Sequence, residues 1–547
     1  MTKPVPTIWT TGSTNVLNTG TWRSQLPIHH STPSPCRIAC PVSGDITRWL
    51  KDIKKNDFYS AWLALIQNNP LPAITGRVCH HPCQQSCNRS EFDEDISICH
   101  LERFVGDRSI HEGWRFPKIE RNIGGRVAVI GSGPAGLSAA YQLRRLGIEV
   151  TIFEKQAELG GVLRYGIPEY RLPKDIVAAE IKRILELGVI VEKGKNIDLR
   201  DQLDKLEQDF DAIFIATGAT VPKELNQLEA FKERVLSGAT FLSEVNRGIS
   251  PSLGERVIVI GGGSAALDVA RSAKRLGSQV SILSLESIED MPADPSEIKE
   301  ASEEQILFLD SAMVVDAVSN DGSIALNCIR VNFNSQIVEP EPIEGTSFMT
   351  YADTIIVSIG QDPDLSGIDG ILDTNGSLIV TKDRFQTNRQ KIFAGGDLIS
   401  EQRFVSKALG DGKNAALNIA QFINIATEST KHTETEPVDF KRINTFYYSR
   451  SSKIYEVEKR ADERIKDFNE VRSGVSEEDA VKEADRCFSC GICVECNNCY
   501  YFCPDHAIIQ TKNKDAPYEV QTQYCKGCGL CVAECPTGSI YLREERR

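Results

Sequence analysis

The chain has 547 residues, of which 41% are hydrophobic and 25% are charged, a composition typical of folded, soluble proteins with several domains. Acidic residues outnumber basic residues by 76 to 62, and the net charge of -14 argues against a nucleic-acid partner. No apolar run of about 18 residues could span a membrane, and no secretory signal is visible, so we expect a cytoplasmic protein.

Cysteine usage departs most strongly from an average composition. Sixteen of the 17 cysteines fall in two groups, at positions 36–99 and 487–535. In a long chain without a secretory signal, such grouping favours metal or cluster ligands over disulfides. Cys328 stands alone in a strand-like segment and is predicted to be a small buried hydrophobic residue.

The N-terminal 120 residues are predicted to form a small helical domain with cysteines in its loops. From Asp45 onward the apolar residues follow helical spacing, and Asn69-Pro70 ends the pattern. The cysteines of this region are Cys36, Cys40, Cys79, Cys83, Cys87 and Cys99. Six thiols suffice for one cubane cluster but not for two all-cysteine clusters, and a zinc site is the alternative.

An internal duplication defines the centre of the chain. The segment RVAVIGSGPAGL begins at Arg126, and RVIVIGGGSAAL begins at Arg256 in the same register. Each copy predicts a strand, a glycine turn, a helix and a second strand, which is the opening of a doubly wound dinucleotide-binding unit. We therefore expect a multidomain α/β protein with two Rossmann-like domains. The arrangement resembles that of two-dinucleotide-binding flavoproteins, which implies that the second domain is nested in the first.

The first glycine turn has the residues that a bound dinucleotide requires. Gly131 permits the tight turn, Gly133 lets the backbone approach a pyrophosphate, and Gly136 permits close packing of helix on strand. The N-terminus of the following helix offers unpaired N–H groups to the phosphates. Glu154 ends the second strand, where a carboxylate can accept hydrogen bonds from ribose hydroxyls.

The second turn departs from this pattern at one position. Gly261, Gly263 and Ala266 occupy the fingerprint positions, but Ser284 stands where the first copy has its glutamate. Glu286 follows two residues later, and the segment contains no arginine or lysine for a 2′-phosphate. This composition favours NADH over NADPH.

The C-terminal segment contains two C-x2-C-x2-C-x3-C-P runs, the strongest motif in the sequence. In such runs three closely spaced thiolates bind one cubane, and the fourth cysteine ligates the other cubane. We therefore expect two [4Fe–4S] clusters, one on Cys493, Cys496, Cys499 and Cys535 and one on Cys525, Cys528, Cys531 and Cys503. A pair of structural zinc ions is the alternative.

The residues before these runs are harder to assign. Residues 476–486 predict a helix with Ser476 and Asp479 as a capping pair. Cys487 and Cys490 follow it as either spare thiols or ligands of a further cluster shared with N-terminal cysteines.

With these residues in view, positions 36–425 resemble the small subunit of bacterial glutamate synthase. The same module occurs in dihydropyrimidine dehydrogenase and in bifurcating NADH-dependent ferredoxin:NADP oxidoreductases. The resemblance rests on CRIACP (36–41), GRVCHHPCQQSCNR (76–89), VIGSGPAGL (129–137), GIPEYRLPKDI (166–176), GGGSAALD (261–268) and AGGD (394–397). The tail resembles the ferredoxin subunit of 2-oxoacid:ferredoxin oxidoreductases, and the whole is similar to the iron–sulfur flavoprotein that serves dissimilatory sulfite reductase.

The resemblance implies FAD at the first turn and NADH or NADPH at the second. It adds Gly161, Arg171 and Asp397 as cofactor contacts. It also implies a [4Fe–4S] cluster on Cys40, Cys79, Cys83 and Cys87. Relatives that use NADPH carry paired arginines near positions 285–286, where this chain has Leu285 and Glu286.

Together these features predict a domain order and an electron-transfer function. The expected domains are a helical iron–sulfur domain (1–120), an FAD domain in two parts (121–250 and 366–425), an NAD(P)H domain (251–365), a linker (426–475) and an α+β ferredoxin domain (476–547). NAD(P)H would reduce FAD, and single electrons would pass through the clusters to ferredoxin or a larger redox subunit. No catalytic side chain is required.

Two other functions are compatible with this architecture. The chain could be the electron-donating subunit of a glutamate synthase, or an electron-relay subunit without nucleotide turnover. The sequence does not set an oligomeric state, and a dimer is compatible with it.

Overall fold

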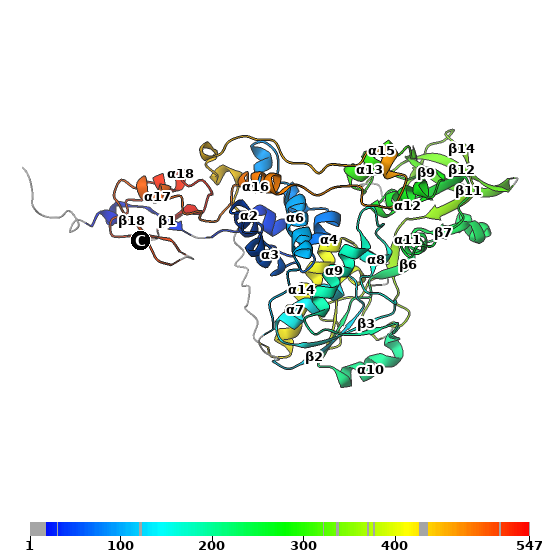
Figure 1. The fold of residues 1–547 in the computed structure, drawn as a ribbon, viewed down its shortest axis with the longest axis horizontal. Coiled ribbons are helices and arrows are strands. Elements are labelled where there is room, and N and C mark those ends of the chain that lie inside the picture. The colour runs from blue at the N-terminus through cyan, green and yellow to red at the C-terminus, as the bar shows by residue number, and fades with distance from the viewer. Residues whose placement is uncertain are drawn as a thin grey trace, which may run out of the picture.

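The structure is a computed structural model that describes residues 18–29, 31–119, 123–320, 322–334, 339–368, 371–375, 378–425, 436–513 and 516–545. The ferredoxin-like segment lies at one end of the elongated molecule, two sheet domains lie toward the other end, and a helical layer separates them (Figure 1). Within the described ranges, no helix is both long and apolar enough to cross a membrane.

The first dinucleotide domain is built on a five-stranded parallel sheet with the order β17–β5–β2–β3–β4. Its elements are β2 (Arg126–Ile130), α7 (Pro134–Arg145), β3 (Glu149–Glu154), α8 (Val162–Tyr165), α9 (Lys174–Leu185), β4 (Ile190–Lys193), α10 (Leu199–Asp209), β5 (Ala212–Ile215), β17 (Ile392–Ala394) and α14 (Val405–Phe422). Strands β2 and β5 are apolar and almost wholly buried, as parallel strands covered on both faces should be.

The second dinucleotide domain has its own parallel sheet, with the order β10–β9–β8–β15–β7, and an antiparallel sheet beside it. Its elements are β7 (Val235–Ser237), α11 (Gly238–Asn246), β8 (Arg256–Ile260), α12 (Ser264–Arg275), β9 (Gln279–Leu283), α13 (Pro295–Glu303), β10 (Leu307–Leu309), β11 (Ala312–Asn320), β12 (Ser323–Asn332), β13 (Glu341–Pro342), β14 (Phe348–Ala352) and β15 (Thr354–Val357). Cys328 is fully buried in β12, as predicted.

The second domain is inserted in the first, which is the nesting that the flavoprotein resemblance implies. Strands β6 (Ala219–Pro222) and β16 (Gln361–Pro363) pair antiparallel where the chain enters and leaves the inserted domain. After this crossing the chain returns to the first sheet through β17 and α14.

The helical iron–sulfur domain connects the sheets to the ferredoxin end. Its helices are α1 (Pro35–Ala39), α2 (Ile46–Lys54), α3 (Phe58–Ile66), α4 (Pro72–Val78), α5 (Pro82–Gln85), α6 (Ile98–His111) and α16 (Glu477–Asp485). Helix α16 begins as predicted, because Ser476 Oγ accepts a hydrogen bond from the Asp479 backbone at 3.1 Å. It packs on the N-terminal helices, where Glu483 accepts a hydrogen bond from the Ser97 backbone at 2.8 Å.

The ferredoxin domain draws on both ends of the described chain. Strand β1 (Gln25–His29) pairs antiparallel with β20 (Ile540–Glu544), and Arg23 forms an ion pair with Glu545 at 2.6 Å. The remaining elements are α17 (Asn498–Tyr501), β18 (Ile508–Gln510), β19 (Tyr518–Val520) and α18 (Leu530–Ala533).

Three predicted boundaries therefore need correction. The segment 18–29 belongs with the ferredoxin domain rather than with the helical domain, and α16 belongs with the helical domain rather than with ferredoxin. Of the predicted linker, residues 426–435 lie outside the described part, and residues 436–475 are bound along their length to other domains. The contacts of β1 with β20 and of α16 with the N-terminal helices join residues hundreds of positions apart, so no local sequence pattern predicts them.

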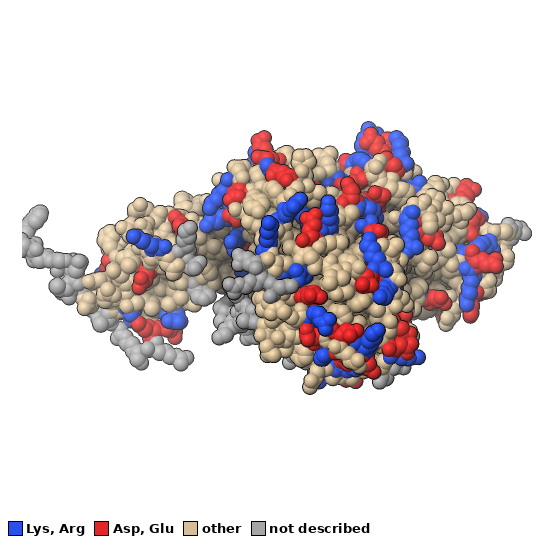
Figure 2. All heavy atoms as spheres, turned by 60° about the horizontal axis from the view of Figure 1, so that its bottom comes forward, with Lys and Arg blue, Asp and Glu red and all other residues tan. Residues whose placement is uncertain are grey.

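Charge is mixed over the face shown in Figure 2. Lysine and arginine side chains alternate there with acidic ones over the large sheet domains, and the ferredoxin end carries fewer charges. The net charge of -14 is therefore not concentrated in one acidic field on this face.

Candidate cofactor and cluster sites

The first glycine turn is shaped by two close backbone contacts. Gly131 has a φ of +101°, and a Cβ placed there would lie 2.5 Å from the Ala216 carbonyl oxygen. A Cβ at Gly136 would lie 2.0 Å from the Gly131 oxygen, so α7 can pack here only without a side chain. Gly133 instead faces open space, which fits a pyrophosphate at the N-terminus of α7.

Glu154 and Gly161 both lie against this turn. The buried carboxylate of Glu154 accepts hydrogen bonds from the backbone and hydroxyl of Ser132, at 3.0 and 2.5 Å, and from the Gln156 backbone at 2.8 Å. A Cβ at Gly161 would be 2.9 Å from the Gly133 Cα. Glu154 therefore stabilises the turn, and Ser132 contributes a contact that the motif did not reveal.

Asp397 is placed to hold a group that carries hydroxyls. It follows β17, and the adjoining Gly396 packs close to Ala135 of α7. The residue is partly buried. Desolvation raises the pKa of Asp397 to about 6, although the Arg403 guanidinium acts to lower it. A carboxylate at this position can accept hydrogen bonds from the hydroxyls of a ribityl chain.

The second glycine turn has the same construction. Gly261 has a φ of +139°, Gly263 faces open space, and Ala266 is fully buried in α12. A Cβ placed on Gly262 would lie 2.7 Å from the carboxylate of Glu286. An acidic side chain therefore lies directly against this turn. The Ser284 hydroxyl donates to the Glu286 carbonyl at 2.8 Å and fixes this loop.

Arg171 departs from the expected cofactor contact. Its guanidinium binds the Asp268 carboxylate at 2.7 Å and also pairs with Glu297. Both acids belong to the helices α12 and α13 of the second domain. Because buried acids require such a partner, Arg171 joins the two dinucleotide domains in this structure.

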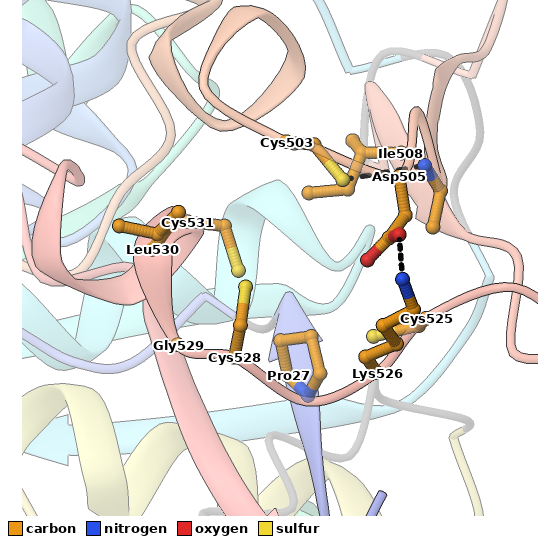
Figure 3. A pocket seen from close by; sticks show the side chains of 11 residues that line it. Pro27, Cys503, Asp505, Ile508, Cys525, Lys526, Cys528, Gly529, Leu530 and Cys531 are labelled. Carbon is orange, nitrogen blue, oxygen red and sulfur yellow. Dashed lines mark hydrogen bonds and ion pairs between the residues drawn. The ribbon is translucent and has the colours of Figure 1, made fainter. Parts of the chain in front are cut away.

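One set of four ferredoxin cysteines lines a single cavity (Figure 3). These are Cys503, Cys525, Cys528 and Cys531, drawn from both runs as the fourth-cysteine rule predicts. The Cys503 sulfur accepts a hydrogen bond from the Ala507 backbone at 3.2 Å. Pro27 of β1 closes one side of the cavity, and the Lys526–Asp505 ion pair at 2.7 Å closes another.

The other ferredoxin set also crosses between the runs. The motif assigns it Cys493, Cys496, Cys499 and Cys535, and Cys499 lies near the other three and also near Cys531 of the first set. Burial, together with these neighbouring thiols, raises the pKa of Cys499 to about 12. Crowded, buried thiols ionise readily only when cations neutralise them, which fits the iron of a cubane.

The third candidate cluster site lies in a cavity of the helical domain, called the third cavity below, and combines thiols with a carboxylate. Its lining includes Cys40, Cys79 and Cys83 together with Glu102 of α6. The Glu102 carboxylate is held by Asn69 at 2.8 Å. Glu102 was missed in the sequence, because one acid on a helix with several charged residues gives no signal.

Cys87 does not line that cavity, so the predicted four-cysteine set needs correction. It lies in a fourth group, made of Cys36, Cys87, Cys487 and Cys490. Burial raises the pKa of Cys36 well above its usual value, and the other three thiols raise it further. Cys487 and Cys490 thus lie beside N-terminal thiols, which favours the cluster hypothesis over spare thiols.

The third and fourth groups are adjacent because two C-x3-C pairs, Cys36/Cys40 and Cys83/Cys87, are divided between them. Cys36 and Cys87 face one group, and Cys40 and Cys83 face the other. Arg89 fixes this division, since its guanidinium donates to the Arg486 carbonyl at 2.6 Å and draws the segment after Cys87 toward the C-terminal cysteines.

No three histidine, cysteine or acidic side chains in the described ranges are arranged around a single metal ion. The ligands of a cubane surround a larger body, because each thiolate binds a different iron ion.

The geometry defines a flavoprotein with two dinucleotide sites and iron–sulfur ligand sets. A family model described as pyridine nucleotide-disulphide oxidoreductase matches residues 125–412. Models of a dihydropyrimidine dehydrogenase 4Fe-4S domain and of a 4Fe-4S dicluster domain match residues 30–114 and 492–539.

Relatives match over most of the chain. The beta subunit of an NADP(+)-dependent formate dehydrogenase from Moorella thermoacetica is 34% identical over 499 residues, covering 84% of this chain and 70% of the relative. The beta subunit of an NADPH-Fe(3+) oxidoreductase from Geobacter sulfurreducens is 31% identical, covering 84% and 75%. The small chain of Escherichia coli glutamate synthase [NADPH] is 28% identical, covering 71% and 89%.

The chain therefore belongs to the pyridine nucleotide-disulphide oxidoreductase family. It is an FAD-dependent NAD(P)H oxidoreductase with [4Fe–4S] clusters at both ends of its sequence.

Proposed function

We propose that this protein passes electrons from NADH, or NADPH, through FAD and [4Fe–4S] clusters to a protein acceptor such as ferredoxin or a larger redox subunit. The proposal rests above all on the order of the sites along the molecule. The second dinucleotide domain and the ferredoxin domain lie at opposite ends, with the helical iron–sulfur domain between them (Figure 1). When bound, the flavin accepts two electrons from a nicotinamide and can release them singly.

Helix α14 supports a short path from the flavin site to the third cavity. A Cβ at Gly412 would lie 2.1 Å from the Ala135 oxygen on α7, and one at Gly410 would lie 2.3 Å from the Pro41 oxygen. Ser406 near the start of the same helix lines the third cavity. The helix thus contacts both the first glycine turn's helix and the loop after Cys40.

A second close contact joins the fourth group to ferredoxin. The Gly491 backbone, next to Cys490, donates to the Thr537 carbonyl at 2.7 Å. The Tyr448 hydroxyl lies between the same two segments, 3.0 Å from the Phe488 carbonyl and 3.3 Å from the Pro536 carbonyl. Such packing keeps neighbouring ligand loops at a fixed separation.

The proposed cluster ligands are the four groups described above. Three sets contain only cysteine, and the third group combines Cys40, Cys79 and Cys83 with Glu102. The cofactor contacts proposed are Gly131, Gly133, Gly136, Glu154, Gly161 and Asp397 for FAD, and Gly261, Gly263, Ala266 and Glu286 for the nicotinamide nucleotide.

We expect NADH to be the better donor, in contrast to the NADP(H) that the relatives' names specify. Glu286 overhangs the second turn, where it can accept hydrogen bonds from a ribose but would repel a 2′-phosphate. The double variant Leu285→Arg/Glu286→Arg should shift preference toward NADPH by about ten- to a hundredfold, the value of a charge-assisted hydrogen bond. The measurement is kcat/KM with each nucleotide. A wild-type protein that uses NADPH as well as NADH would contradict this assignment.

The function itself is tested by reduction of an added ferredoxin under anaerobic conditions. We expect NADH-dependent reduction that needs no other protein. Failure to reduce ferredoxin while the flavin is still reduced by NADH would favour a dedicated partner subunit. A large amidotransferase that co-purifies with the chain would instead favour a role in glutamate synthesis.

A further inference from the structure

The segment predicted as a linker folds into a hairpin on the second dinucleotide domain. The Lys459 backbone donates to the Val471 carbonyl, and the Ser473 backbone donates to the Val457 carbonyl, both at 2.9 Å. These bonds close a loop that contains the short helix α15 (Ala461–Arg464). In Figure 1 the hairpin extends from the helical domain to the side of α13 and returns to α16.

Its approach to the helical domain is held by ion pairs. Lys453 binds Asp95 at 2.7 Å, and Glu456 binds Arg103 of α6 at 2.9 Å. The hairpin is therefore anchored at its base before it reaches the second dinucleotide domain.

Arg464 is the deepest contact of the hairpin. Its side chain is 2% exposed and binds the Glu304 carboxylate at 2.9 Å and the Glu303 carboxylate at 2.7 Å. It also donates to the Glu300 carbonyl at 3.1 Å. Arg472, on the returning strand, pairs with the Glu300 carboxylate. Two arginines of the hairpin thus hold the C-terminal turn of α13.

The same acids connect α13 to α12. Glu304 also binds Arg271 at 2.7 Å and Arg275 at 2.9 Å, and both arginines lie on α12. Although burial acts against ionisation, the hydrogen bonds from these two arginines hold the pKa of Glu304 at about 2. A buried carboxylate with three guanidinium partners fixes the helices that carry them, because each lost partner leaves uncompensated charge.

Helix α12 is the helix that begins at the second glycine turn. The first dinucleotide domain reaches the same junction through Tyr170, whose ring packs 3.9 Å from the Arg275 guanidinium carbon. The Tyr170 carbonyl in turn accepts a hydrogen bond from the Val471 backbone of the hairpin at 3.0 Å. The hairpin, α12 and the first domain therefore meet at one point.

We propose that the hairpin Val457–Ser473 is a positioning element for the nicotinamide nucleotide, acting through Arg464 and Glu304 on helix α12. It fixes the orientation of the α12 N-terminus relative to the flavin domain, so that the nucleotide binds in a preorganised site. This role rests on the proposed function, in which the second turn binds NAD(P)H.

The test replaces Arg464 by methionine, which keeps most of the side-chain volume. Glu304 retains Arg271 and Arg275 in this variant, so we expect the protein to fold with its FAD and iron. The nucleotide concentration that half-saturates flavin reduction should rise about tenfold, below the ~100-fold that a 1 Å displacement can cost. Reduction by dithionite, which does not use the nucleotide site, should be unchanged.

Arg460→Met is the matched control, because Arg460 lies on the same hairpin but is 78% exposed and pairs only with Asp462 at the surface. Arg464→Lys should recover part of the nucleotide affinity, since it keeps the charge but loses the forked contacts. If the methionine variant loses FAD, the proposal is tested with the lysine variant instead, by comparing its half-saturating nucleotide concentration with that of the wild-type protein.

An unchanged half-saturation in the variant that retains FAD would overturn the proposal, even if its melting temperature fell. A wild-type protein that neither nucleotide reduces would instead overturn the proposed function. The two failures are therefore distinguished by the wild-type measurement.

Discussion

Replacing Cys487 and Cys490 by serine should lower the iron content of the chain from about sixteen ions to about twelve, because four cubanes contain four ions each. The two thiols lie with Cys36 and Cys87, and two remaining cysteines cannot hold a cubane alone. Iron is measured per chain after anaerobic purification, with FAD content as the check that the flavin domain is intact.

Cys99→Ala is the matched control for this experiment. Cys99 is a half-buried thiol of the same helical domain, but it belongs to none of the four groups. We expect it to leave the iron content unchanged. An iron content that stays at the wild-type value in the double variant would show that the fourth group is not a cluster site.

The single variants Gly133→Val and Gly263→Val should each impair one nucleotide site and leave the other intact. Neither glycine has a positive φ, and a Cβ at either position meets nothing within 4 Å, so the protein itself tolerates a side chain there. That open space is where the pyrophosphate of a bound dinucleotide would lie. Because overpacking a filled site costs about 1–3 kcal/mol, affinity should fall by about ten- to a hundredfold.

Each variant serves as the control for the other. Gly133→Val should purify with little FAD but with its iron. Gly263→Val should keep FAD and iron, but its flavin should be reduced by NADH only at much higher nucleotide concentration. Loss of FAD from the Gly263 variant, or normal FAD content in the Gly133 variant, would show that the two turns are wrongly assigned.

Local patterns predicted most of the individual sites. The glycine turns could be predicted because each lies between an apolar strand and a helix. The structure has a strand before and a helix after both Gly131 and Gly261. The ferredoxin runs are readable because three of the four thiols lie within a few residues. The placement of Cys503 beside Cys525, Cys528 and Cys531 follows from the same motif.

Contacts between distant segments could not be predicted in this way. Cys87 stands four residues after Cys83, and its spacing alone suggests a shared cluster. Its partners, however, are set by Arg89 and the Arg486 carbonyl, almost 400 positions apart in the chain. The pairing of β1 with β20 is equally distant.

The contacts of charged residues were the hardest to predict from the sequence. Glu102 was missed as a lining group of the third cavity, and Arg171 was expected at a cofactor but binds Asp268. The hairpin fell within the predicted linker (426–475), which was inferred from the polar segment 426–437 that lacks an apolar period. Its binding comes from buried ion pairs such as Arg464–Glu304, which leave no periodic pattern.

The most direct test of the central claim is an anaerobic titration of the purified wild-type protein with NADH, and separately with NADPH, while flavin and cluster absorbance are recorded. We predict that NADH bleaches the flavin band and that the cluster absorbance falls with it, in a protein with about sixteen iron ions per chain. A flavin band that neither nucleotide bleaches would contradict electron entry through the second dinucleotide domain.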